Sequence, residues 1–147
     1  MYLVNKESYM FLFFITIVSF LLLLRLFLIH TLNIPIHFDE AQYWIWSKNL
    51  EWGYYSKPPL LAWLLKFNSF ICGNSEICIK SISPFLHSLT STIIFYSSYT
   101  LSKDKNNAFY GGLIFLLMPG VTFSSFFAST DVPLLFFSTL CGVLLLH

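Results

Sequence analysis

The chain has 147 residues, of which 56% are hydrophobic and 20% aromatic, and its formal net charge is +1. This composition excludes an intrinsically disordered chain and is too apolar for a typical soluble domain. No run of Lys and Arg could follow a phosphate backbone, so nucleic acid is excluded as a partner. The composition therefore points to an integral membrane protein.

The first apolar segment, residues 9–32, is long enough to cross a bilayer as a helix. A secretory signal peptide is the alternative, because Lys6 precedes the apolar run. The run is longer than a signal peptide requires, and no small-x-small cleavage site follows it. A retained transmembrane helix is therefore predicted.

Three further apolar segments follow. Residues 82–101 are rich in Ser and Thr, which a helix tolerates because their hydroxyls bond back to preceding carbonyls. Residues 108–127 contain Gly111-Gly112 and Pro119-Gly120, which predict close helix packing and a kink, respectively. Residues 132–147 begin a fourth segment, and the sequence stops before that span is complete. We expect an all-α, polytopic integral membrane helix bundle with about four transmembrane helices, truncated in the fourth.

A loop of about fifty residues, 33–80, separates the first two spans. Loops of this length usually have a function. Asp39 is the expected N-cap of a short helix that runs to about Leu50 and carries several aromatic residues. Residues 60–71 form a second short apolar stretch. Both are predicted to be interfacial helices that lie along the membrane surface.

The three cysteines are less informative. Cys72 and Cys78 flank a turn-like stretch, and we expect two free thiols there. A disulfide is the alternative if the loop faces an oxidising compartment. Cys141 lies in an apolar segment and is expected to be an inert core or lipid-facing residue.

Charge does not determine the orientation in the membrane. Lysines occur both in the long loop and in the short turn that contains Lys103 and Lys105, so the positive-inside rule favours neither side. Hydropathy predicts only that the long loop and residues 124–131 lie on one side, opposite Lys103.

Asp39 and Glu40 are the first candidates for chemistry. A carboxylate at an apolar boundary is desolvated, which raises its pKa and makes it a better base near neutral pH. The alternative is an acidic helix cap that faces water.

Lys57 precedes two prolines that hold it extended, and a fixed cation near the headgroups suits a lipid phosphate. Its alternative is an ordinary interfacial lysine.

Two further charged residues lie at or inside the predicted spans. Asp131 stands where the third segment gives way to the fourth, so it is either functional or a helix cap. Arg25 lies within the first span, near the end that leads to the long loop. Extension to the membrane surface is its expected role, and binding of a lipid phosphate is the alternative.

One histidine stands close to the acidic pair. His37 with the two carboxylates could hold a divalent ion, but the spacing is not specific, so no cofactor is expected. The sequence contains no nucleophile elbow, P-loop, Rossmann glycine pattern or paired Cys-x-x-Cys.

Taken together, these motifs resemble the N-terminal part of the GT-C integral-membrane glycosyltransferases. The chain is most similar to the bacterial group related to protein O-mannosyltransferases and lipid A aminoarabinose transferases. The resemblance rests on Asp39-Glu40-Ala41, on the segment from Gly53 to Leu60 that contains Tyr54-Tyr55-Ser56-Lys57-Pro58-Pro59, and on Ser129-Thr130-Asp131-Val132-Pro133-Leu134. It implies that residues 1–147 are the N-terminal portion of a longer transmembrane domain.

The resemblance also implies a function. Such enzymes make an inverting transfer of a sugar from a polyprenyl-phosphate donor to a lipid or protein acceptor, at the extracytoplasmic face of the bacterial inner membrane. Asp39 would be the base, Glu40 its support and Asp131 a second acid. Lys57 would bind the donor phosphate, and the other expected substrate-binding residues are Tyr54, Tyr55 and Arg25. A non-catalytic membrane subunit or a transporter fragment is the alternative, although Arg25 is the only charge inside a predicted span.

Overall fold

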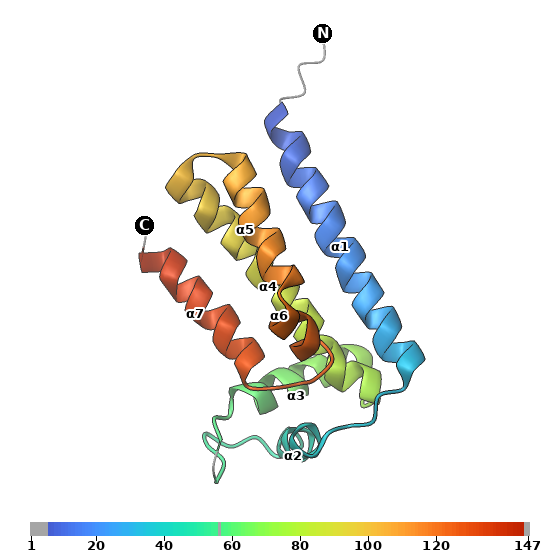
Figure 1. Cartoon of the computed structure of the whole chain (residues 1–147). Coiled ribbons are helices and arrows are strands. Elements are labelled where there is room, and N and C mark those ends of the chain that lie inside the picture. The colour runs from blue at the N-terminus through green and yellow to red at the C-terminus, as the bar shows by residue number, and fades with distance from the viewer. Residues whose placement is uncertain (1–5, 56, 146–147) are drawn as a thin grey trace.

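The computed structural model describes residues 6–55 and 57–145, with side chains from Tyr9 onward. The described residues form seven α-helices and no strand, which confirms the all-α prediction. The longest are α1 (Lys6–Leu32) and α4 (Glu76–Ser102). Figure 1 shows α1, α4, α5 (Lys105–Leu117) and α7 (Asp131–Leu145) running roughly along one axis. Among them, α4 is central because it packs against α1, α5 and α7.

Two of the described helices, α1 from Tyr9 and α4, are long and apolar enough to cross a membrane. The first corresponds to the predicted span 9–32, and the second begins six residues before the predicted span 82–101. Ser75 provides the reason for the earlier start, because its hydroxyl caps α4 by accepting a hydrogen bond from the Cys78 N–H. The other two predicted spans correspond to shorter helices.

The third apolar segment is broken rather than kinked. Helix α5 ends at Leu117, and α6 (Pro119–Ser124) begins with a proline that lacks a backbone N–H. Met118 between them has φ −56° and ψ 133°, the extended conformation that a residue before proline prefers. The prediction of a single kinked helix over 108–127 was therefore wrong.

The glycine pair in α5 packs closely against its neighbours, as predicted. A Cβ atom added to Gly112 would lie 2.6 Å from the ring of Phe14 on α1 and 3.1 Å from the Ser91 carbonyl oxygen on α4. A Cβ atom added to Gly111 would lie 2.9 Å from the Ser98 hydroxyl oxygen. The missing side chains thus bring α5 against both long helices.

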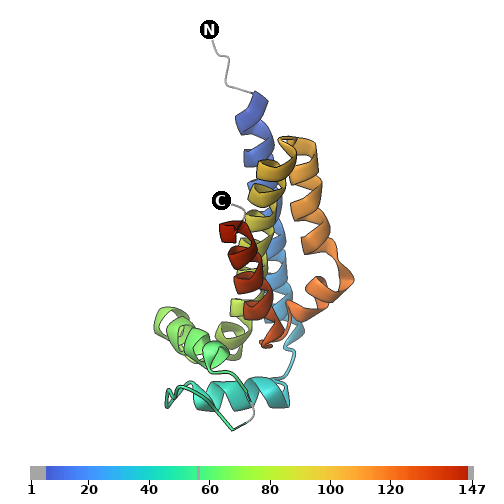
Figure 2. The same ribbon diagram turned by 90° about the vertical axis from the view of Figure 1, so that its left-hand side faces the viewer.

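Two short helices, α2 (Phe38–Trp46) and α3 (Leu60–Cys72), lie across one end of the long helices (Figures 1 and 2). Helix α3 confirms the helix predicted over residues 60–71. The N-cap of α2 is His37 and not Asp39, and the helix ends before Leu50. Their place along the membrane surface stays a prediction.

Cys72 and Cys78 form a disulfide with their Cα atoms 5.8 Å apart. The expectation of two free thiols was therefore wrong. Gly73 ends α3 with φ +87°, a positive value that glycine adopts readily, and this turn lets the chain reverse within the five residues between the cysteines. The disulfide consequently joins the C-terminus of α3 to the first turn of α4. Cys141 is a free, exposed thiol on α7.

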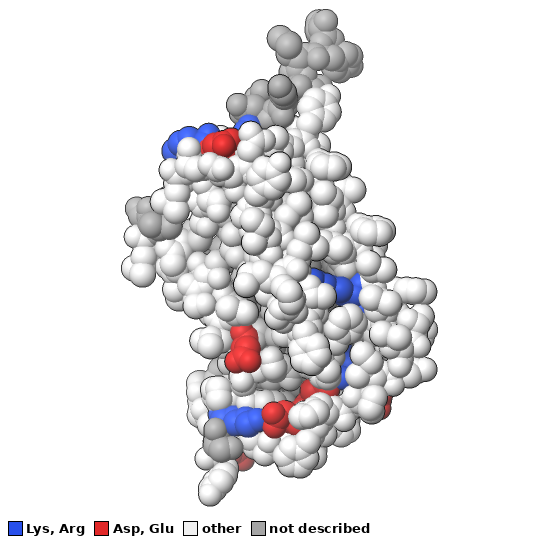
Figure 3. Space-filling view, in the orientation of Figure 1, with Lys and Arg blue, Asp and Glu red and all other residues white. Residues whose placement is uncertain are grey.

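The buried apolar side chains form two clusters. One lies where α2, α3, α4 and the start of α7 meet, and includes Tyr43, Leu61 and Ile82. The other lies towards the opposite end between α1, α4 and α5, around Phe14 and Phe95. Charged side chains gather mostly towards the two ends, and the upper middle of the visible surface carries none (Figure 3).

The ends of the bundle agree with the predicted constraint on topology. The backbone N–H of Ala128 bonds to Glu40, so the segment after α6 meets the long loop at one end. The turn after α4, which contains Lys103, lies at the other end (Figure 1).

Candidate active site at the loop end of the bundle

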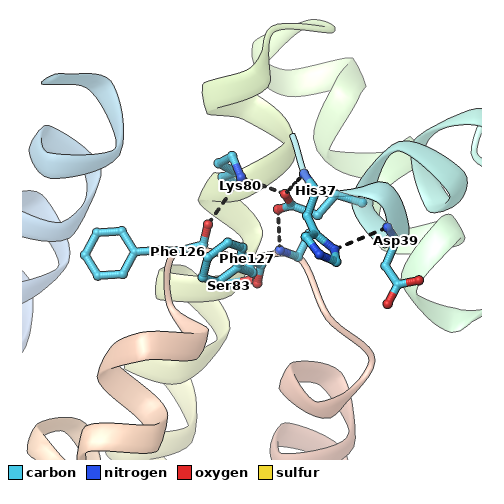
Figure 4. Close-up of polar contacts among 8 residues, drawn as sticks. His37, Asp39, Lys80, Ser83, Phe126 and Phe127 are labelled. Atoms are coloured by element: carbon cyan, nitrogen blue, oxygen red, sulfur yellow. Dashed lines mark hydrogen bonds and ion pairs between the residues drawn. The ribbon is translucent and has the colours of Figure 1, made fainter. Parts of the chain in front are cut away.

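Glu40 is the buried centre of the loop end, with 1% of its surface exposed. One carboxylate oxygen, Oε2, accepts hydrogen bonds from the His37 backbone N–H at 2.8 Å and from Lys80 Nζ at 2.6 Å. The other, Oε1, accepts from the Ala128 backbone N–H at 2.7 Å (Figure 4). One side chain therefore joins α2, α4 and the segment between α6 and α7.

Lys80 completes this buried ion pair and is equally inaccessible. Its Nζ also donates to the Phe126 carbonyl at 3.4 Å, and the Phe127 ring lies 5.2 Å away. Ser83, one turn further along α4, donates to the Phe127 carbonyl at 2.6 Å (Figure 4). These contacts satisfy the carbonyl groups of two half-buried residues in the segment between α6 and α7.

Asp39 and the adjacent Glu40 have different ion-pair partners. Its Oδ1 lies 2.8 Å from Lys57 Nζ, and the side chains are 51% and 29% exposed, respectively. The structure thus brings together the carboxylate and the lysine that the sequence singled out 18 positions apart. The desolvation expected for Asp39 is not present, because half of its side chain faces solvent.

Lys57 lies over the ring of Tyr43, with Nζ 5.3 Å from the ring centroid. The hydrogen bond to Asp39 raises the pKa of Lys57 above its ordinary value of 10.5, so the lysine is a cation at neutral pH. Tyr43 is buried beneath the pair, and this burial raises the pKa of its hydroxyl. The site therefore holds a fixed cation over the face of an aromatic ring.

A pocket of about 340 Å³ opens beside these residues. The three carboxylates Asp39, Glu40 and Asp131 line it, together with the N-cap residue of α2 and residues of α6 and of the segment before α7: His37, Phe123, Ser124, Phe127, Ala128 and Ser129. Asp131 is the first residue of α7, where a carboxylate is favoured by the helix dipole. The structure thus gathers all three predicted acidic residues at one cavity.

Tyr54 lies outside the lining of this pocket. Its ring stacks on Trp46 at 4.5 Å, and its hydroxyl donates to the carbonyls of Trp46 and Asn49. These contacts shape the loop after α2. Tyr55 is fully exposed, so the structure gives it no partner that would position it for a substrate.

Arg25 also lies outside the lining and does not extend to the surface as expected, since only 5% of the residue is exposed. Its Nη2 donates to the Leu116 carbonyl at 2.6 Å and lies 3.4 Å from the Thr122 hydroxyl. The contacts of Arg25 are therefore with the break between α5 and α6.

The residues considered for a metal are used in other ways. His37 Nδ1 accepts a hydrogen bond from the Asp39 backbone N–H at 3.5 Å, and the Glu40 side chain accepts from the His37 N–H, which together form a capping box. Glu40 already has three donors. In residues 6–55 and 57–145, no three His, Cys, Asp or Glu side chains converge as metal ligands would.

Sequence reasoning missed the pairing of Lys80 with Glu40. It treated Lys80 as one of several loop lysines, although the residue lies two positions before the apolar run 82–101 in a chain with only 10% charged residues. A lysine at the edge of an apolar span must either reach solvent or pair with an acidic side chain. This requirement could have indicated that Lys80 has an acidic partner. The His37-x-x-Glu40 spacing was a second signal, because Glu at this position completes a capping box.

An all-helical membrane bundle with acidic residues and a fixed lysine at one end is an arrangement suited to sugar transfer at a membrane surface. The class defined by these features is that of the GT-C integral-membrane glycosyltransferases. The model of the family described as dolichyl-phosphate-mannose-protein mannosyltransferase matches residues 56–147, which is more than half of the sequence. The chain belongs to this glycosyltransferase family, and with α1 and α4 this identifies a membrane protein.

A curated relative is the lipid A galacturonosyltransferase RgtD of Rhizobium johnstonii (strain DSM 114642 / LMG 32736 / 3841). The two proteins are 39% identical over 100 residues, which cover 67% of this chain and 21% of the relative. The match thus corresponds to about a fifth of the relative's length. No solved structure matches the chain.

Proposed function

We propose that the protein transfers a sugar from a polyprenyl-phosphate donor to a lipid or protein acceptor at the extracytoplasmic face of the bacterial inner membrane. The observation that carries this proposal is the Asp39–Lys57 pair, 2.8 Å apart beside a pocket that Asp131 also lines. Such a transfer requires a base for the acceptor hydroxyl and a cation for the donor phosphate, and this pair supplies both kinds of group beside one pocket.

In the proposed reaction, Lys57 binds the phosphate that joins the sugar to the polyprenyl chain. This phosphodiester carries one negative charge, as the carboxylate does, and its two free oxygens can accept hydrogen bonds from the ammonium group in place of Asp39. Its negative charge increases as the bond to the sugar breaks, so the lysine stabilises the leaving group. Asp39 is then available to accept the proton of the acceptor hydroxyl. The acceptor oxygen bonds to the anomeric carbon from the opposite side as the bond to the phosphate oxygen breaks, and this inverts the configuration.

The other acidic residues have separate parts in this proposal. Asp131, the first residue of α7, also lines the pocket and is the second acidic residue for the acceptor or the sugar. Glu40 is not available for proton transfer because its oxygens accept three hydrogen bonds in a buried site. Its role is to hold α2 so that Asp39 faces the pocket.

The disulfide supports an extracytoplasmic site. Disulfides persist in oxidising compartments and are rare in the reducing cytoplasm. Cys72 and Cys78 lie at the same end of the molecule as the pocket. The bond therefore favours the orientation that the lysines did not determine.

We also propose that the chain crosses the membrane four times. Helices α1 and α4 are the first two spans, α5 with α6 the third, and α7 the fourth. Helices α2 and α3 lie across the end of the bundle that carries the pocket, which suits a position at the membrane surface (Figure 2).

A transfer assay tests the proposal. Membranes that contain the protein, expressed from its complete reading frame, are supplied with polyprenyl-phosphate galacturonic acid and lipid A, chosen after the relative. We expect Asp39→Asn and Lys57→Ala to abolish transfer without loss of membrane insertion. Lys66→Ala on α3 is the matched control and should transfer normally. Normal transfer activity in either of these two variants would contradict the role proposed for the substituted residue.

An inactive wild-type protein with this donor would lead to the same assay with other polyprenyl-phosphate sugars. If none were consumed, the alternative of a non-catalytic membrane subunit would replace the proposal.

A further inference from the structure

Arg25 is a buried cation in the first span, and neither ion pair among the described residues includes it. Its strong contact is the hydrogen bond from Nη2 to the carbonyl oxygen of Leu116 at 2.6 Å. The hydroxyl of Thr122 lies 3.4 Å from the same nitrogen and donates to the same carbonyl at 3.3 Å. Three elements, α1, α5 and α6, thus meet at one oxygen atom.

The position of this carbonyl explains why a donor is needed. Leu116 belongs to the last turn of α5, whose carbonyls lack partners within the helix. Backbone groups freed at a break inside a membrane bundle must be satisfied by side chains, because lipid offers no hydrogen bonds. A guanidinium group supplies a charge-assisted donor and holds the break in one geometry.

The break determines where α6 goes, and α6 forms one wall of the pocket. Phe123 and Ser124 of α6 line the pocket, and the Ser124 hydroxyl lies 2.8 Å from His87 Nε2 on α4. The chain then continues to Ala128, whose N–H bonds to Glu40. Contacts at both ends of this short stretch therefore hold it against the rest of the site.

We propose that Arg25 is a positioning residue that fixes the α5–α6 break and through it the α6 wall of the active-site pocket. The assignment of the pocket as an active site rests on the proposed function, but the anchoring of α6 does not. Arg25 acts through Leu116 and Thr122, and it does not touch the donor phosphate.

Thiol labelling tests this without any substrate. In a Cys141→Ala background, Ser125→Cys places a buried thiol at the C-cap of α6, and Ser47→Cys places a matched buried thiol at the C-cap of α2. Labelling by a water-soluble maleimide reports local opening at each place.

We expect Arg25→Met to accelerate labelling at position 125 roughly tenfold, since loss of a hydrogen bond from a charged donor shifts a local opening by about that factor or more. Labelling at position 47 should not change. Arg25→Lys should give an intermediate rate because it retains one donor. Thr122→Val should give a smaller increase, and Thr31→Val, which removes an exposed hydroxyl of α1, should give none.

Unchanged labelling at position 125 in both Arg25 variants would overturn the proposal. An increased KM for the donor with unchanged labelling would instead assign Arg25 to phosphate binding. If Arg25→Met fails to insert, Arg25→Lys and Thr122→Val decide the question by the same measurement. An inactive protein in the transfer assay would leave this result intact, so the two proposals can fail separately.

Discussion

Asp39 and Glu40 are neighbours in the sequence and have opposite environments. Both lie in the first turn of α2, where successive side chains point about 100° apart. This rotation directs Glu40 towards α4 and Ala128, and it leaves Asp39 at the pocket with half of its side chain exposed. The acidic pair therefore combines a buried anchor with a carboxylate that lines the pocket.

This division predicts different effects on stability. Glu40→Ala leaves Lys80 as an uncompensated buried charge and should lower the free energy of unfolding by about 3–5 kcal/mol. Asp39→Ala removes a partly exposed ion pair and should cost no more than about 1 kcal/mol. Denaturant unfolding of the two variants in detergent measures the difference, and equal costs would contradict the assigned roles.

The sequence predicted which residues belong to the candidate site, but it did not predict all of the contacts that these residues make. Asp39, Lys57 and Asp131 were selected because charge beside apolar spans is rare, and the structure places all three at or beside one pocket. The burial of Arg25 was not predicted. The position of an arginine within an apolar run predicts its depth in the membrane. It does not predict whether the arginine side chain contacts a helix break in a neighbouring segment.

At the scale of elements, the irregular features of this bundle have local causes. Pro119 breaks the third apolar segment because it offers no N–H and restrains Met118. The Gly111-Gly112 pair brings α5 close to α1 and α4. The sequence predicted an effect of both but not the complete break, at which the side chains of Arg25 and Thr122 donate to the freed Leu116 carbonyl.

Substitution of the glycines tests the close packing. Gly112→Ala would place a Cβ atom 2.6 Å from the buried ring of Phe14, so we expect a loss of about 1–3 kcal/mol in the free energy of unfolding. Gly142→Ala on α7 meets nothing within 4 Å and should be neutral or stabilise the helix by up to about 1 kcal/mol. Thermal unfolding in detergent compares the two, and a neutral Gly112→Ala would contradict the packing.

At the scale of the whole molecule, the two ends of the bundle differ in the structural features that they contain. One end holds the pocket, the disulfide and the buried ion pair, and the other holds the turn with Lys103. The longest helix of the loop end, α3, is tied to α4 by the disulfide and by the Asn68 side chain, which donates to the Cys78 carbonyl at 2.6 Å. The pocket end is thus braced by covalent and polar contacts as well as by apolar packing.

The proposed orientation is testable in intact cells. Single cysteines at Tyr55→Cys and Ser102→Cys, in a Cys141→Ala background, lie at opposite ends of the molecule and are exposed. We expect an impermeant maleimide to label position 55 from outside and position 102 only after the membrane is permeabilised. Labelling of both from one side would contradict the topology, and the reverse pattern would contradict the extracytoplasmic site.

The sequence by itself determined the helical membrane architecture and the residues proposed for the candidate site. The physical reason is that long apolar runs, breakers and isolated charges act locally, and each can be recognised without its neighbours. Tertiary structure alone decided that Glu40 pairs with Lys80 40 positions away, that Arg25 meets Leu116 and that Cys72 pairs with Cys78. The first two contacts depend on which faces of distant segments meet, and that is set by packing of the whole bundle. The disulfide depends on the turn at Gly73, which brings the end of α3 against the start of α4.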